Sequence, residues 1–151
     1  MTQPDRGTRS LNALAYAGVL PFLLGIAMQV TGVTLFGVDG LLWFATYSAT
    51  ILSFLCGIWW GAMLNRPGYP HASTLTLLSN LFCIGAWVGV MLYRTAWGLP
   101  LLAIGYGLVA WSEARLNPNA PDLGSYFKTR GRVTCLVIGC HLIMIGSLWI
   151  H

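Results

Sequence analysis

Five apolar stretches alternate with short polar segments along the chain, at about 11–30, 41–64, 73–93, 99–114 and 133–150. Roughly 20 apolar residues, at about 1.5 Å of rise each, are enough to cross the hydrocarbon core of a bilayer as a helix. The polar residues gather between the stretches, and the longest polar segment is 116–132. The pattern therefore predicts an all-α polytopic membrane protein, a bundle of five transmembrane helices forming a single domain over 1–151.

Local signals place the ends of these helices. Ser10 and Asp39 are residue types that cap helix N-termini, so we expect them to begin the first and second helices. Residues 1–9 are polar and are expected to precede the first helix. Pro21 lies in the middle of the first stretch and should kink it. This stretch is longer than a typical signal-peptide core and no clear cleavage site follows it, so we expect it to be retained as a span.

The second stretch, 41–64, is uncharged and carries small residues at every fourth position. Small residues at this spacing allow two membrane helices to approach closely. The candidate helix-packing residues are Ala45, Ala49, Ser53, Gly57 and Gly61, together with Gly85 and Gly89 in the third stretch. The glycine pairs each form a G-x-x-x-G motif. We expect the row to seat a neighbouring span of the same chain, with a homodimer seam as the alternative, and we expect 41–64 to be the packing centre.

Composition supports a lipid environment. Hydrophobic residues make up 56% of the chain and charged residues 8%, whereas soluble domains carry about 25% charged residues. So few charges could not cover the surface of a water-soluble domain. The four cysteines all fall within apolar stretches, and none forms a Cys-x-x-Cys pair. We therefore expect free thiols rather than a disulfide framework.

The basic residues are distributed unequally between the two sides that five crossings would create. One side receives Arg6, Arg9, Arg66, Arg115, Lys128, Arg130 and Arg132, and the other receives Arg94. Positively charged loops remain on the cytoplasmic side, so the N-terminus should be cytoplasmic and the C-terminus external. We expect a multi-pass protein of the bacterial inner membrane. This asymmetry explains the net charge of +4 without a nucleic-acid partner.

One motif resembles a known family. Residues 47–61 read YSATILSFLCGIWWG, and three weaker stretches also fit: Gly18–Phe22, the third stretch through Trp87, and Tyr126–Thr134. The chain resembles the membrane proteins grouped as a domain of unknown function, the family that includes transmembrane protein 69. The resemblance implies a polytopic inner-membrane protein, and it implies no activity, cofactor or catalytic residue.

Three polar residues within the apolar stretches form the candidate polar site: Glu113, Asn80 and His141. Glu113 is the only acid within a stretch and lies near a helix C-terminus, where the helix dipole disfavours a carboxylate, so it needs a cation. The candidate cations are Arg66, Arg115, Arg130 and Arg132. One interpretation is a proton relay or solute site, and the favoured one is an ion pair that locks the fourth helix to the inner loops.

Cys83, Cys140 and His141 are weak candidates for a metal site near the middle of the membrane. Thiolate and imidazole would suit zinc or copper. No ligand-spacing motif supports such a site, so no metal or other cofactor is expected. The favoured interpretation is that the cysteines fill apolar space and that His141 is hydrogen-bonded to Asn80 or to a backbone carbonyl.

Three functions remain as hypotheses. The leading one is a small non-enzymatic accessory or assembly factor that acts through helix–helix contacts. Its partners, besides the lipid bilayer, would be other membrane proteins or a second copy of the chain. The second is a small transporter or a lipid- or quinone-binding protein with Glu113, Asn80 and His141 lining a cavity. The third is a metal or redox protein using Cys83, Cys140 and His141.

Overall fold

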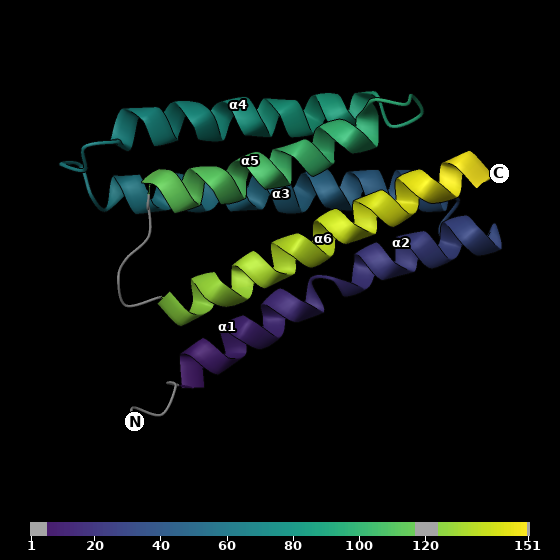
Figure 1. Ribbon diagram of the computed structural model, residues 1–151, viewed down its shortest axis with the longest axis horizontal. Helices are drawn as coiled ribbons and strands as arrows, with labels where there is room; N and C mark the ends of the chain where they lie inside the picture. Colours follow the sequence, from purple (N-terminus) through teal and green to yellow (C-terminus); the bar gives the residue numbers. More distant parts are fainter. Residues whose placement is uncertain (1–5, 117–123, 151) are drawn as a thin grey trace.

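The computed structural model describes residues 6–116 and 124–150, and over these residues the chain forms six helices and no strand. The helices are α1 (Arg6–Ala17), α2 (Leu20–Thr31), α3 (Gly40–Leu64), α4 (Ala72–Met91), α5 (Gly98–Leu116) and α6 (Gly124–Ile150). They lie side by side as an elongated bundle, with short connections at its two ends (Figure 1). The prediction of an all-α fold is confirmed for the described residues.

The first apolar stretch is divided into two helices close to the position where Pro21 was expected to kink it. α1 ends at Ala17, and α2 begins at Leu20 with Pro21 in its first turn. Proline has no N–H to bond the carbonyl four residues before it, and its ring clashes with that carbonyl, which for Pro21 belongs to Ala17, the last residue of α1. The Tyr47 hydroxyl of α3 donates to the carbonyl of Gly18 at 3.0 Å, so a neighbouring helix satisfies a carbonyl at the break.

Two predicted helix ends are corrected by the structure. α1 begins at Arg6, so Ser10 lies inside the helix and is not its N-cap. α6 begins at Gly124, so 124–132 are helical and only 117–123 of the predicted loop lie outside the described residues. The charges along 128–132 predicted a loop. A helix can carry them here because Lys128 and Arg132 are exposed and Arg130 pairs with an acid. Asp39 does cap α3, accepting the backbone N–H of Leu42 at 2.7 Å.

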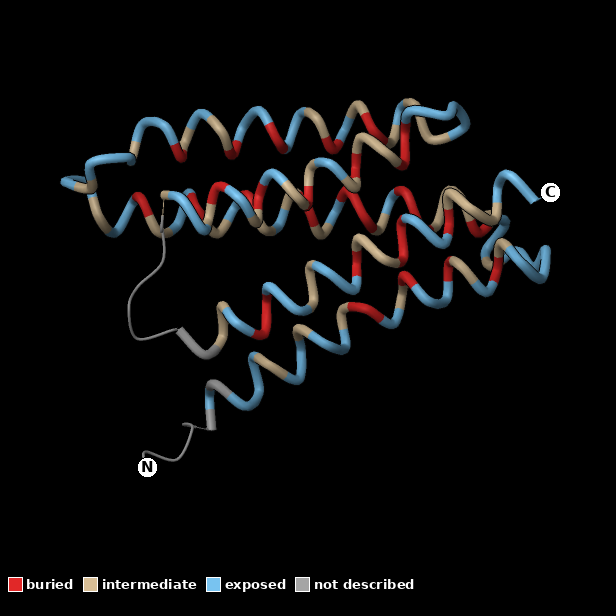
Figure 2. Tube along the Cα trace, in the orientation of Figure 1, coloured by how far each residue is buried: buried red, intermediate tan, exposed pale blue. Residues whose placement is uncertain are grey.

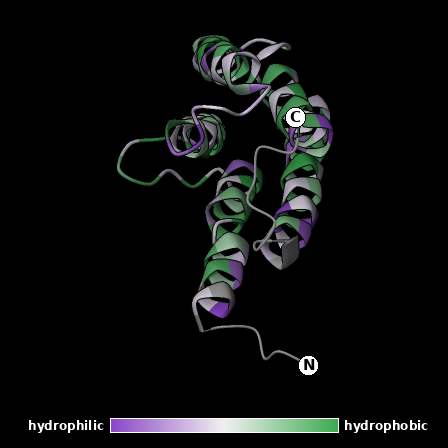
Figure 3. Ribbon diagram, turned by 90° about the vertical axis from the view of Figure 1, so that its left-hand side faces the viewer, coloured by the Kyte–Doolittle hydropathy of each residue, from purple (hydrophilic) through white to green (hydrophobic). Residues whose placement is uncertain are grey.

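Among the described helices, α3 makes the most extensive helix–helix contacts. It packs against α2, α4 and α5, while α6 packs against α5, α2 and α1. Figure 3 views the molecule from one end and shows the helices grouped around a common interior. The prediction that 41–64 is the packing centre agrees with this arrangement.

Within residues 6–116 and 124–150, four helical segments are long and apolar enough to cross a membrane: Arg9–Thr31, Gly40–Leu64, Ala72–Met91 and Tyr126–Ile150. They make the chain a multi-pass membrane protein. α5 runs alongside α3 and α4 (Figure 1). It does not belong to this group, because Glu113 and Arg115 reduce its apolar character.

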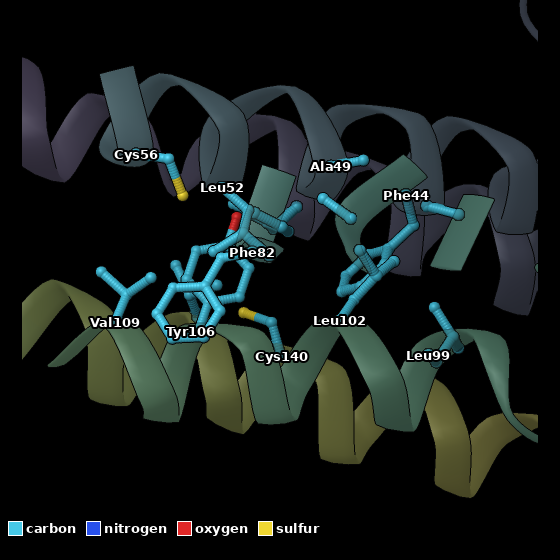
Figure 4. Close-up of a cluster of buried hydrophobic side chains, with 14 of the residues drawn as sticks. Phe44, Ala49, Leu52, Cys56, Phe82, Leu99, Leu102, Tyr106, Val109 and Cys140 are labelled. Carbon is cyan, nitrogen blue, oxygen red and sulfur yellow. The ribbon is translucent and has the colours of Figure 1, made fainter. Parts of the chain in front are cut away.

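The interior is a tightly packed layer of aromatic and aliphatic side chains. Phe44, Leu52, Leu102 and Tyr106 are almost fully buried, and Figure 4 shows them meeting between α3 and α5. Buried positions recur on the inward side of α2 to α6, and exposed positions face outward (Figure 2). Many outward side chains are large and apolar, such as Trp87 and Ile143. An apolar exterior of this kind suits contact with lipid.

Candidate functional site

The first polar centre joins three helices near one end of the bundle. Trp59 of α3, Glu113 of α5 and Arg130 of α6 meet there. The Trp59 Nε1–H donates to Glu113 Oε1 at 2.9 Å, and Arg130 Nη2 lies 2.7 Å from the same oxygen. The Arg130 side chain is 6% exposed and that of Glu113 is 14% exposed. The carboxylate thus holds an indole and a guanidinium together inside the bundle.

Of the four candidate cations, Arg130 is the one that pairs with Glu113. Arg132 is exposed, and the Arg115 guanidinium lies over the Trp111 ring, 5.8 Å from its centre. The favoured interpretation of Glu113 as part of an ion pair is therefore supported. Its partner lies on helix α6, in the stretch where the sequence suggested a loop.

Arg130 is only partly satisfied by this contact. Its Nη2 is close to Glu113 but not aligned as a hydrogen bond, so the contact is a charge pairing. Within the described part of the chain, Nε and Nη1 are buried and have no hydrogen-bond partner. Buried polar groups are usually hydrogen-bonded, and a charged group left without partners is costly. Arg130 therefore has donors available for a further acceptor.

A cavity of about 230 Å³ lies beside Arg130, between α1, α3, α5 and α6. We call it the Arg130 cavity. Most of its wall is apolar, with polar atoms contributed by side chains of α5 and α6. Its lining includes Leu11, Leu14, Phe54, Tyr126, Arg130 and Thr134. The geometry is that of an apolar slot with a cationic group in one wall.

The second polar centre is a buried histidine. The Nδ1 of His141 lies 2.8 Å from the carbonyl oxygen of Val137, and its Nε2 lies 2.8 Å from the Ser48 hydroxyl. A carbonyl oxygen only accepts, so Nδ1 carries the proton, and in the neutral ring the Ser48 hydroxyl donates to Nε2. Tyr106 donates to the backbone carbonyl of Ser48 at 2.8 Å. His141 therefore ties α6 to α3. Two hydrogen-bond partners were expected for it from the sequence, Asn80 or a backbone carbonyl, and the structure shows the carbonyl of Val137.

Three aromatic rings pack around His141. The rings of Phe44, Tyr106 and Phe22 lie 4.8, 5.4 and 5.8 Å from the imidazole, measured between ring centres. His141 is fully buried among them. Such a histidine acts as a structural clamp between helices.

The three residues of the candidate polar site do not come together. His141 follows Arg130 by three turns of α6, roughly 16 Å along the helix axis. Asn80 is exposed on α4, and its side-chain amide donates to the carbonyl of Thr76 at 2.9 Å. Glu113, Asn80 and His141 thus have separate hydrogen-bonding or ionic partners.

The cysteines are free thiols, as expected. Cys140 is buried, whereas Cys83 is exposed and its Sγ lies 3.5 Å from the Ser53 hydroxyl. No group of three or more histidine, cysteine, aspartate or glutamate side chains with metal-binding geometry occurs in residues 6–116 and 124–150. The combination of Cys83, Cys140 and His141 is not a ligand cluster there.

The row of small residues on α3 turns around the helix rather than staying on one face. Ala45 and Ala49 are buried, but Gly57 and Gly61 are exposed, and a Cβ added at either would meet nothing within 4 Å. A four-residue step advances about 40° beyond a full turn, so the row drifts by roughly 160° from Ala45 to Gly61. The packing role of Gly57 and Gly61 stays a prediction.

The glycine pair of α4 behaves differently. Gly89 is buried, and an added Cβ would lie 2.8 Å from Leu102 Cγ on α5, so this position is used in packing within the chain. Gly85 is half-buried and has open space beside it. It lines an apolar notch between α4 and α5.

Sequence reasoning missed three members of the polar centres: Trp59, Ser48 and Tyr106. Trp59 lies opposite the exposed Gly57 and Gly61, and a buried indole N–H usually has an acceptor. That signal could have placed Trp59 beside Glu113. No comparable signal linked Ser48 to His141, because the two are 93 residues apart.

The fold and the two polar centres define the class: an all-helical multi-pass membrane protein whose interior polar groups join neighbouring helices. The model of the family described as "Protein of unknown function (DUF3429)" matches residues 8–146. The chain belongs to that family, so the expectation of a domain-of-unknown-function family is confirmed. Neither among curated proteins nor among solved structures is there a match to this chain.

Proposed function

We propose that this protein is a non-enzymatic accessory or assembly factor that binds a transmembrane helix of a larger membrane-protein complex. The observation that carries the proposal is the open glycine pair Gly57 and Gly61 on the outward face of α3. Bare backbone at this spacing lets a second helix approach closely where water cannot drive association. Leu64 is exposed on the same face and would border the docked helix.

The interior of the bundle supports a binding role over catalysis. Glu113 is engaged by Arg130 and Trp59, and His141 by Ser48 and the carbonyl of Val137. Catalytic groups act together on one reacting centre, and these two centres are separated by several turns of α6. The resemblance of 47–61 to the family of transmembrane protein 69 supports a polytopic membrane role and supplies no activity.

The proposal includes five crossings, with α5 as the fourth. α5 has 19 residues and packs against α3, α4 and α6. Its acid is neutralised by Arg130, which lowers the free-energy cost of placing this helix in lipid. With five crossings, the two termini lie on opposite sides of the bacterial inner membrane. The excess of basic residues then places the N-terminus in the cytoplasm and the C-terminus outside.

Co-purification in mild detergent tests the docking proposal. We expect the wild-type protein to retain a membrane-protein partner and the double variant Gly57→Leu, Gly61→Leu to lose it. The matched control is Gly139→Leu with Gly146→Leu on α6, where an added Cβ also meets nothing within 4 Å. Equal retention by both double variants would contradict the proposal. Recovery of a self-associated dimer that depends on Gly57 and Gly61 would replace the heterologous partner with a second copy.

A second candidate function is the binding of a lipid-like molecule. The specific observation that favours it is the Arg130 cavity, in which a buried cation with unused donors faces an apolar slot. This candidate differs from the one expected from sequence, because Asn80 and His141 do not line the cavity.

A further inference from the structure

The Arg130 cavity lies where the N-terminal part of α6 faces α1 and α3. The apolar membrane segment of α6 begins at Tyr126, so Arg130 lies about one turn inside it. A guanidinium at this depth is close enough to the headgroup layer to meet a polar lipid group. The rest of the cavity wall is contributed mainly by aliphatic and aromatic side chains, including Leu14, Phe54 and Val133.

Arg130 provides the recognition element. Its side chain is 6% exposed, and Glu113 takes up only the Nη2 side of the guanidinium. The buried Nε and Nη1 have no hydrogen-bond partner among the described residues, although they belong to a charged group. A guanidinium presents its donors in a planar fork that matches the oxygens of a phosphate. An anion in the cavity would satisfy these donors.

The charges around the cavity favour an anion over a neutral ligand. Arg9, Lys128 and Arg132 are exposed at the same end of the bundle. Among the described residues, Glu113 is the only acid at this end, because Asp39 caps the opposite end of α3. A quinone carbonyl would satisfy Arg130 but would gain nothing from the surrounding positive charge.

We propose that the Arg130 cavity binds an anionic phospholipid, with the headgroup phosphate at Arg130 and part of one acyl chain between α1 and α3. The apolar wall accounts for the chain, and the unused guanidinium donors account for the phosphate. The site rests on the second candidate function above and is separate from the proposed docking face, since neither Gly57 nor Gly61 lines the cavity. Each proposal can therefore fail while the other stands.

The test is native mass spectrometry of the full-length protein, delipidated in mild detergent. The probes are short-chain phosphatidylglycerol, phosphatidylcholine of the same chain length, a soluble quinone and inorganic phosphate. We expect phosphatidylglycerol to form a stable one-to-one adduct and the other probes to bind at least about tenfold more weakly, as expected for a charge-assisted contact. Equal binding of phosphatidylcholine or the quinone would overturn the proposal. Phosphate binding as tightly as phosphatidylglycerol would show a free-anion site and overturn the lipid part.

Two arginine substitutions test whether the phosphatidylglycerol adduct forms at Arg130. Arg130→Gln should weaken phosphatidylglycerol binding roughly ten- to hundredfold, whereas Arg132→Gln removes the same charge from an exposed position nearby and should leave binding nearly unchanged. Equal losses in both variants would show a general surface-charge effect and contradict the site.

A second pair of variants keeps the test decisive if Arg130→Gln does not fold. Ala15 lines the cavity from α1 and Ala13 is exposed on the same helix outside the lining. Ala15→Trp should fill the slot and abolish the adduct without changing any charge, and Ala13→Trp should not. Retention of the adduct in Ala15→Trp would overturn the proposal.

Discussion

Glu113 and Arg130 illustrate how single residues in this bundle depend on one another. Each would be costly to bury alone, and each lies among apolar side chains on a different helix. Their pairing, with the Trp59 indole on the same carboxylate oxygen, makes both tolerable. Replacing one member therefore acts mainly through the charge that it leaves behind.

The first prediction concerns this pair. Glu113→Ala leaves Arg130 as an uncompensated buried cation and should lower the free energy of unfolding by about 3–5 kcal/mol. The double variant Glu113→Ala, Arg130→Met removes both charges and should recover a large part of that loss. Thermal unfolding in detergent, analysed as a double-mutant cycle, measures the coupling. Additive effects of the two single variants would mean that the pair does not couple.

At the scale of the elements, the closest helix contacts involve glycines outside the G-x-x-x-G motifs. Gly25 of α2 and Gly40 at the start of α3 lie against each other. A Cβ at Gly40 would be 2.4 Å from the backbone nitrogen of Gln29 and 2.7 Å from the carbonyl oxygen of Gly25. Since backbone atoms cannot swing aside as a side chain can, the α2–α3 contact requires glycine at this position.

The second prediction compares two glycines of the same helix. Gly40→Ala should lower the free energy of unfolding by about 1–3 kcal/mol, because α2 must move away from α3. Gly57→Ala adds the same methyl group in open space and should change stability by less than about 0.5 kcal/mol. Thermal unfolding of the two variants in one detergent provides the measurement. A larger effect at Gly57 than at Gly40 would contradict the arrangement of α2 and α3.

At the scale of the whole molecule, the connections fix which helix ends share a side. The 65–71 connection joins α3 to α4 at one end of the bundle, and the 92–97 connection joins α4 to α5 at the other (Figure 1). If α5 crosses the membrane, its C-terminal end at Leu116 lies on the side of 65–71. The positive charge then gathers on that side, as the proposed cytoplasmic orientation requires.

The third prediction tests this topology with single cysteines in a variant lacking the four native ones. In intact cells, a membrane-impermeant maleimide should label Thr95→Cys in the 92–97 connection. It should not label Gly68→Cys or Asn119→Cys until the membrane is opened. Labelling of Thr95→Cys and Asn119→Cys from the same side would show that α5 does not cross. Labelling of Gly68→Cys alone in intact cells would invert the proposed orientation.

Features set by local sequence were predictable. Long uncharged stretches predicted α3 and α4 to within two residues at each end, and Asp39 was identified as the cap of α3. The start of α6 was misplaced because charges along 128–132 were taken as a loop signal. A helix buried on one side can carry Arg130 inward and Lys128 outward, and that depends on neighbours not specified by local sequence.

The candidate site was predictable only in part. The need of Glu113 for a cation followed from the low polarity of a membrane interior, but four arginines could have met it. Which of these arginines pairs with Glu113 depends on how α5 and α6 are rotated relative to each other, and that rotation brings Arg130 to it. The small-residue row was expected to share one face, and the 3.6-residue period of the helix carries its two ends to opposite sides of α3.

The sequence alone determined that lipid surrounds this protein and where most of its helices lie, because apolar length and scarcity of charge act locally along the chain. The tertiary structure decided that Arg130 pairs with Glu113, that Ser48 holds His141, and that Gly25 and Gly40 touch. These contacts join residues distant in the chain, and their formation depends on the order and rotation of whole helices.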